Sequence, residues 1–145
     1  MFTLEEAQEA ILEHLQSNFV QPVKEQAIPD IESVPKTNGK VDPYLIVQFG
    51  DIYNNGRHAM SGAFDDDYAL PVYVTSIAGE AGIARGMANK VIRVMLGATV
   101  HEWAGQIRER PGGGMFSATA SNSGTEAYAY PSVFRVGIQL AVSEP

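Results

Sequence analysis

Apolar residues recur at helical spacing from the beginning of the chain, and the nearby glutamates fall mostly outside that stripe. The stripe consists of Leu4, Ala7, Ile11, Leu15 and Phe19. Thr3 and Glu6 have the spacing of a capping box, in which side chains satisfy the free backbone N–H groups at the start of a helix. The pattern predicts a helix from about Leu4 to Phe19.

The next segment, 21–43, is rich in residues that break helices. Its prolines are Pro22, Pro29, Pro35 and Pro43, and an Asn38-Gly39 pair lies between the last two. This spacing excludes a long helix and favours turns around one short extended piece near Ala27 and Ile28. We therefore interpret the segment as a connector outside the core.

Two strands are predicted on either side of a long polar segment. Tyr44–Phe49 (YLIVQF) is a compact apolar run that ends at a glycine, and Leu70–Ile77 (LPVYVTSI) resumes the pattern. The segment 51–67 joins them as a long loop or as a hairpin with an extended tip. Pro71 cannot donate to a ladder, so we expect it at the beginning of its strand or on an edge.

A second helix is predicted over Gly79–Gly97. Its expected apolar stripe is Ile83, Met87, Val91 and Val94. Small residues lie between these positions, and two of them, Gly82 and Gly86, each weaken a helix by about 1 kcal/mol relative to alanine. We expect close packing on a sheet to explain them. Arg85, Lys90 and Arg93 make the outer face basic.

The C-terminal third alternates in the manner of a strand. Met115–Ala120 predicts a weak strand, and a polar turn follows at Ser121–Gly124. In the last segment Phe134, Val136, Ile138, Leu140 and Val142 alternate with more polar or smaller residues. Periodicity leaves Thr99–Arg110 open between a strand and a short helix.

The order of these elements defines the expected fold class. Helix, strand, strand, helix, strand, strand, with hairpin-like links within each pair of strands, predicts an α+β fold. We expect a mostly antiparallel sheet of about four strands, with two main helices packed on one face. The length of 145 residues predicts one domain over 1–145.

Composition narrows the classes of function. The net charge is −7, and no basic block is long enough to follow a phosphate backbone, so direct nucleic-acid binding is not expected. The chain has no cysteine, which excludes disulfides and thiol chemistry. No apolar run approaches a bilayer-spanning length, and the acidic N-terminus does not resemble a signal peptide, so neither export nor anchoring is predicted.

No constellation of residues predicts catalysis. His14, His58 and His101 lack metal-ligand spacing, and Asp65-Asp66-Asp67 lacks the spaced ligands of an EF-hand. Nucleophile-elbow, phosphate-loop and dinucleotide motifs are also missing. We therefore expect no catalytic, cofactor-binding or metal site, and we expect Trp103 to pack in the core.

Two glycine-containing loops, 51–67 and 109–114, are candidates for contacts with neighbouring proteins, because long loops in compact domains are commonly functional. The candidate subunit-interface residues come from these loops, from the position just before the second loop, and from the basic face of the second helix. These are Asp65, Asp66, Asp67, Arg85, Arg93, Arg108 and Arg110.

This layout resembles the tail terminator family of long-tailed bacteriophages, the minor tail protein U-like proteins, particularly those of actinobacterial phages. The resemblance covers nearly the whole chain and is one of layout with loose local similarity. It is carried by the N-terminal amphipathic helix, the proline-containing connector, and the segments YLIVQFG, LPVYVTSIAG, AGIARGMANKVIRVMLG and VFRVGIQLAV.

The resemblance implies a structural virion protein that forms a homohexameric ring on the finished tail tube. Such a ring ends tube polymerisation at the head-proximal end of the tail and offers a surface to the head-completion or stopper protein. It is assembled in the host cytoplasm, and DNA passes through its lumen without specific binding. The acidic first helix and the basic second helix are candidates for the two complementary faces that a ring needs.

Two other classes of function remain open. The first is a head-tail adaptor or stopper of the same virion, of which the stopper more typically has a small β-barrel. The second is a small cellular enzyme or ligand-binding module, which a deep pocket with convergent polar groups would support.

Overall fold

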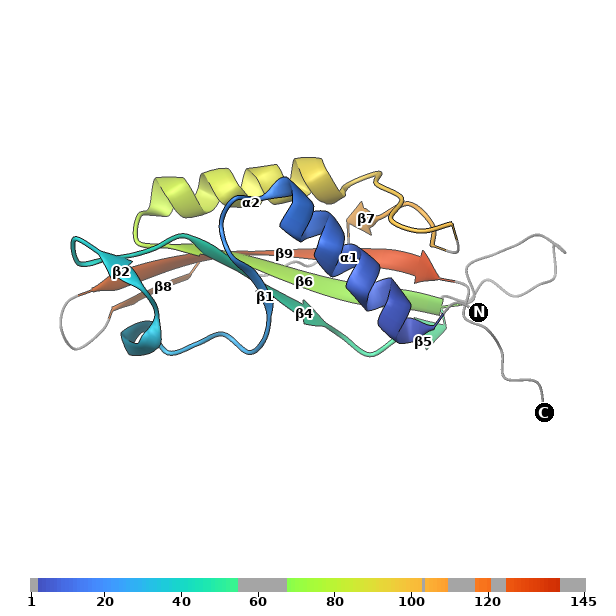
Figure 1. Cartoon of the computed structure of the whole chain (residues 1–145), viewed down its shortest axis with the longest axis horizontal. Helices are drawn as coiled ribbons and strands as arrows, with labels where there is room; N and C mark the ends of the chain where they lie inside the picture. The colour runs from blue at the N-terminus through green and yellow to red at the C-terminus, as the bar shows by residue number, and fades with distance from the viewer. Residues whose placement is uncertain (1–2, 55–67, 103, 110–116, 121–124, 139–145) are drawn as a thin grey trace, which may run out of the picture.

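The computed structural model describes residues 3–54, 68–102, 104–109, 117–120 and 125–138. Two α-helices, one 3₁₀ helix and a main sheet make up this part of the chain (Figure 1). The helices are α1 (Leu4–Asn18), η1 (Ile31–Ser33) and α2 (Ala81–Met95). The strands are β1 (Val23–Glu25), β2 (Lys36–Thr37), β3 (Lys40–Val41), β4 (Tyr44–Phe49), β5 (Tyr53–Asn54), β6 (Tyr68–Ala78), β7 (Arg108–Glu109), β8 (Ser117–Ala120) and β9 (Glu126–Ile138).

The main sheet is built around the long strands β6 and β9. Their antiparallel register runs over eleven positions, from Tyr68 opposite Ile138 to Ala78 opposite Tyr128. Strand β4 pairs antiparallel with β6 on the other side, and β1 adds a short parallel edge to β4. The path is β1-β4-β6-β9-β7, with β5 on β6 and β8 on β9. The fold is therefore α+β with a mostly antiparallel sheet, as predicted.

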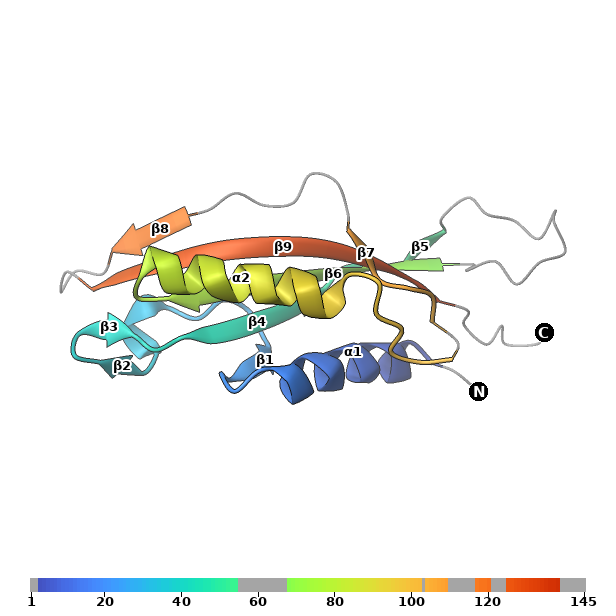
Figure 2. The same cartoon turned by 90° about the horizontal axis from the view of Figure 1, so that it is seen from above.

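Both α-helices cover the same face of this sheet, here called the helix face (Figure 2). Helix α2 packs on β6 and β9, and α1 packs on β1 and beside α2. The largest side chains that are fully buried in this layer include Ile11, Leu15, Leu45, Leu70, Met95 and Phe134. Burial of one such side chain stabilises the fold by about 1.5–3 kcal/mol.

Helix α1 forms as its pattern predicts. The hydroxyl of Thr3 accepts a hydrogen bond from the backbone N–H of Glu6 at 3.2 Å, which is the first half of the capping box. In place of the second half, the same hydroxyl donates to the Glu6 carboxylate at 3.3 Å. Ala7, Ile11 and Leu15 are buried, so the predicted stripe faces the core.

The prediction that 21–43 lies outside the core is wrong. The extended piece is β1 at Val23–Glu25, upstream of the predicted Ala27 and Ile28. The turn at Asn38-Gly39 joins β2 to β3 with both residues at positive φ, at 54° and 77°. Val34 and Val41 are buried with Ile46 and Ile77 against the opposite face of the sheet. The connector contributes to the core because its few aliphatic residues cover the face that the helices leave open.

The predicted apolar stripe of α2 is partly wrong. The buried residues are Ala84, Met87, Ala88, Val91 and Met95, whereas Ile83 is 43% exposed. The alanines face the sheet because their small side chains let the helix axis approach it. Gly82 and Gly86 lie on the outer side, where an added Cβ would meet no atom within 4 Å. Close packing on the sheet therefore does not explain these two glycines.

Two prolines lie inside long strands without removing a donor from the ladder between β6 and β9. Strand β6 begins before the predicted Leu70, so Pro71 is internal. The Pro71 carbonyl accepts a hydrogen bond from the Gly50 N–H at 3.0 Å. The nitrogen and the carbonyl of a strand residue point to the same side, so the Pro71 nitrogen also points away from β9. On that side β6 has no paired strand at Pro71, because β4 ends and β5 has not yet begun. By the alternation of the ladder, Pro131 in β9 directs its nitrogen away from β6.

The remaining predictions have mixed outcomes. Over 99–109 the described backbone is mostly irregular, with a bridge from Ala104 to Ile138 and the short strand β7. Strand β9 begins at Glu126, upstream of the predicted alternating segment, and the burial of Phe134, Val136 and Ile138 is confirmed. Trp103, the turn at 121–124, Leu140 and Val142 lie outside the described residues.

Gly79 lies at a point of close backbone contact. Its N–H donates to the Val41 carbonyl at 3.0 Å, and a Cβ there would lie 2.7 Å from the Val41 nitrogen. We expect Gly79→Ala to lower the free energy of unfolding by about 1–3 kcal/mol, because backbone has to move to accommodate the methyl group.

The matched control is Gly82→Ala on the open side of α2. It should raise the free energy of unfolding by about 0.5–1 kcal/mol, because alanine favours the helix and meets no neighbour. Urea denaturation followed by circular dichroism measures both changes. Equal effects of the two substitutions would contradict this assignment of close contact.

Candidate functional site

The exposed surface of α1 is acidic. Glu5, Glu6, Glu9 and Glu13 are all exposed, and the helix contains no lysine or arginine. Glu5, Glu9 and Glu13 follow one another at i,i+4 spacing, so their carboxylates lie along one side of the helix. Like charges at this spacing destabilise a helix by about 0.2–0.5 kcal/mol per pair. The repulsion between neighbouring carboxylates is therefore unfavourable for the isolated subunit.

The exposed surface of α2 has the opposite charge. Arg85 and Arg93 are exposed, and no aspartate or glutamate occurs between Ala81 and Met95. Lys90 is half-buried, with its Nζ 4.7 Å from the centroid of the Phe19 ring. This cation–π contact holds the lysine beside the C-terminal end of α1. The two arginines are the cations that remain directed outward.

Neither helix neutralises the other within the subunit. Within the described ranges, no ion pair joins a glutamate of α1 or an arginine of α2 to another residue. The ion pair observed in these ranges is that of Lys40 with Glu80. Both members of that pair are well exposed, so it contributes little stability. The two helices therefore present uncompensated charges of opposite sign to solvent.

A polar contact fixes how the two helices meet. The Nε2–H of His14 donates to the Val94 carbonyl in the last turn of α2 at 2.9 Å. Figure 1 shows α2 along the upper side of the molecule and α1 crossing in front of the sheet, and Figure 2 shows α1 along the lower side while α2 faces the viewer. The outer faces of the two helices thus point in different directions.

The predicted interface residues do not form one cluster. Arg85 and Arg93 lie on the outer side of α2. Arg108 lies on β7 directly opposite Arg135, so both belong to the face of the sheet opposite the helices. Asp65, Asp66, Asp67 and Arg110 lie outside the described residues.

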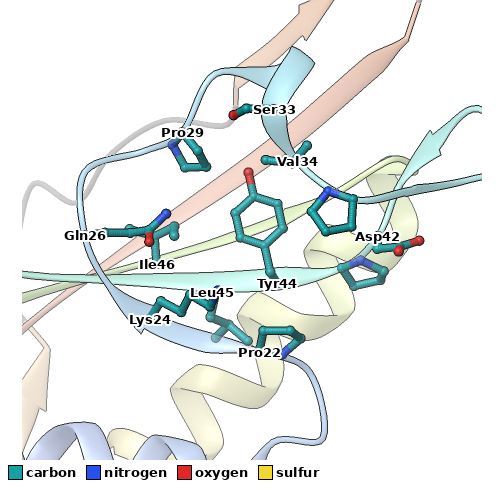
Figure 3. Close-up of a pocket in the computed structure, with 12 residues that line it drawn as sticks. Pro22, Lys24, Gln26, Pro29, Ser33, Val34, Asp42, Tyr44, Leu45 and Ile46 are labelled. Carbon is teal, nitrogen blue, oxygen red and sulfur yellow. The ribbon is translucent and has the colours of Figure 1, made fainter.

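A pocket of about 410 Å³ lies on that opposite face, between the connector and β4 (Figure 3). Its apolar lining includes Pro22, Pro29, Val34, Pro35, Pro43 and Ile46. Polar groups come from Lys24, Gln26, Ser33, Asp42 and Tyr44. The Tyr44 ring stands up from β4 toward Ser33 and Val34, and burial raises the pKa of its phenol.

Sequence reasoning did not anticipate this pocket. The four prolines of the connector indicate turns, but they do not indicate that the segment folds back over β4 and leaves a space beneath it. The aromatic residue at the beginning of a strand, next to Pro43, is the one sequence signal that marks the location.

The described part of the chain shows neither a cluster of metal-binding side chains nor a membrane-spanning helix. Within those ranges no group of three or more histidine, aspartate or glutamate side chains is placed to hold a metal ion. No helix there has both the length and the apolar character to cross a membrane.

Comparison of the chain with protein-family models and with curated proteins finds no match.

We predict that His14→Ala lowers the free energy of unfolding by about 1 kcal/mol, because the Val94 carbonyl loses its donor at the contact between the helices. Thermal and urea denaturation measure this change. Glu13→Ala is the control, since it removes an exposed neighbouring side chain and one like-charge repulsion. A His14→Ala variant as stable as the Glu13→Ala variant would show that the hydrogen bond does not hold the helices together.

Proposed function

We propose that this protein is a tail terminator, a subunit of a hexameric ring that closes the tail tube of a long-tailed bacteriophage. The observation that carries the proposal is the position of α2. The helix follows β6 directly and packs across the antiparallel pair of β6 and β9. This is the arrangement that the resemblance to tail terminators predicts.

The same observation favours a terminator over a stopper of the same virion. A stopper typically has a small β-barrel, in which the sheet closes on itself. Here the sheet is a layer whose one face is covered by helices and whose edge strand β1 is short. An adaptor remains a neighbouring role in the same machine.

Electrostatics also supports a ring subunit. A ring of subunits that each carry a net charge of −7 repels the phosphates of DNA in its lumen, so a passing strand is not trapped. A ring built from one kind of subunit also needs two different faces that fit each other. The acidic α1 and the basic α2 are two such faces with opposite charge.

The pocket beside Tyr44 supports a second candidate function, that of a ligand-binding module. Its volume of about 410 Å³ lies within the range of small-molecule sites, and its lining combines apolar walls with a few polar groups. In this alternative the chain acts on its own and the helix faces are ordinary solvated surfaces.

Native mass spectrometry over a range of concentrations distinguishes the two candidates. The terminator predicts a discrete hexamer of the 15.7 kDa chain without a bound small molecule. Electron microscopy of tail tubes, assembled from the tube protein of the same virus, should then show rings at tube ends and an arrest of growth. A monomer or dimer that holds a stoichiometric ligand, together with tubes that grow unchanged, would replace the terminator with the ligand-binding module.

A further inference from the structure

We propose that the outer face of α2 docks on the acidic face of α1 of a second copy of this chain. The inference rests on the proposed ring and names the surfaces that join its subunits. The α2 seam is defined here as Gly82, Gly86, Asn89 and Arg93, and the α1 acidic face as Glu5, Glu9 and Glu13.

Helical geometry places the four seam residues on one line. At 3.6 residues per turn, positions 82, 86, 89 and 93 fall on the side of α2 that is opposite the buried Ala84, Ala88 and Val91. All four are exposed. Arg85 and Ile92 flank the seam on one side and Ile83 on the other, so the seam ends in the cation Arg93, and its borders contain a second cation and two apolar side chains.

Charge complementarity identifies the occupant as a second copy. Every exposed charged side chain of α2 is basic, and every charged side chain of α1 is acidic. The α1 carboxylates lie at i,i+4 spacing. The seam contains two pairs with the same spacing, Gly82 with Gly86 and Asn89 with Arg93. Bringing Arg93 and Arg85 against these carboxylates relieves the repulsion along α1 and pairs the free cations of α2.

The glycines make a close approach possible. An added Cβ at Gly82 or Gly86 would meet nothing within 4 Å, so the surface is open to another chain. Each glycine weakens α2 by about 1 kcal/mol relative to alanine, and nothing described within the subunit requires it. A neighbouring helix whose side chains pack against the exposed backbone of Gly82 and Gly86 would explain why these positions are glycine.

The directions of the two faces determine the kind of assembly. Because the outer faces of α1 and α2 point in different directions (Figures 1 and 2), each copy uses one face toward one neighbour and the other face toward the next. Such a contact is heterologous, and it generates a ring when the rotation between copies closes.

Charge reversal tests the contact. An α1-reversed chain carries Glu5→Lys, Glu9→Lys and Glu13→Lys, and an α2-reversed chain carries Arg85→Glu and Arg93→Glu. Each alone has two faces of like charge and should lose assembly in native mass spectrometry. An equimolar mixture should recover it, with the two chains in equal number, because each reversed face then meets its complement.

The control for net charge is a chain with Asp30→Lys, Glu32→Lys and Glu102→Lys, three exposed positions outside both helices and outside the main sheet. It has the same net charge as the α1-reversed chain and should assemble as the wild type does. Circular dichroism melting of each variant establishes that all of them fold.

A second pair of variants tests the seam itself. Gly86→Leu should stabilise the isolated subunit, because leucine favours a helix, the position is exposed and an added Cβ there meets nothing within 4 Å, yet it should abolish assembly by filling the seam. Since the natural chain contains no cysteine, the double variant Glu9→Cys, Asn89→Cys can be oxidised to trap the contact. A heterologous contact gives a ladder of covalent oligomers, and an isologous one stops at a dimer.

The outcomes separate the docking contact from the proposed function. Reversed chains that assemble like the wild type, or cysteine variants that give no covalent oligomers, overturn the docking of α2 on α1 and leave tube capping intact. Recovery in the mixture together with a ladder supports the contact. Tubes that grow unchanged in the presence of assembled rings overturn the terminator and leave the contact standing.

Discussion

The antiparallel pairing of β6 with β9 is the constraint on which the rest of the structure depends. It joins eleven residue pairs that are far apart in sequence, and it supplies Val72, Val74, Phe134 and Val136 to the surface that α2 covers. Helix α2 lies between β6 and β9 in the sequence, and the pairing brings the two strands together beneath this helix. Strand β4 then extends the same surface toward α1, so both helices owe their positions to one ladder.

The elements that sequence reasoning predicted well are those whose signals are local. Tyr44–Phe49 is a continuous apolar run between Pro43 and Gly50, and its predicted bounds match β4. Helix α1 combines a cap with a clear stripe. Strand β9 begins upstream of the predicted segment and includes Pro131, and no local signal tells that the nitrogen of this proline points away from β6. The face of α2 was misjudged because hydrophobicity favoured Ile83, whereas distance to the sheet selects the alanines.

The candidate site shows the same division. The signs of charge on α1 and α2 follow from composition and helical period, so they were predictable. That the charges lack partners within the described ranges, and that the two faces point in different directions, depends on how the helices sit on the sheet. The pocket beside Tyr44 depends on the path of a connector that was expected to lie outside the core. The prolines of the connector determine that it turns, but the burial of Val34 and Val41 determines which face of the sheet it covers.

The outer surfaces of both helices contain residues that lower the stability of a single subunit. Glu5, Glu9 and Glu13 repel one another, and Gly82 and Gly86 weaken α2 without relieving any contact within the part of the chain that the structure describes. A partner that binds only the folded chain offsets such losses by mass action. In the proposed contact the same residues that destabilise the free subunit form the surfaces that join it to its neighbours. Folding and assembly are then thermodynamically linked, because a subunit whose α1 or α2 is frayed cannot present the face that the next copy needs.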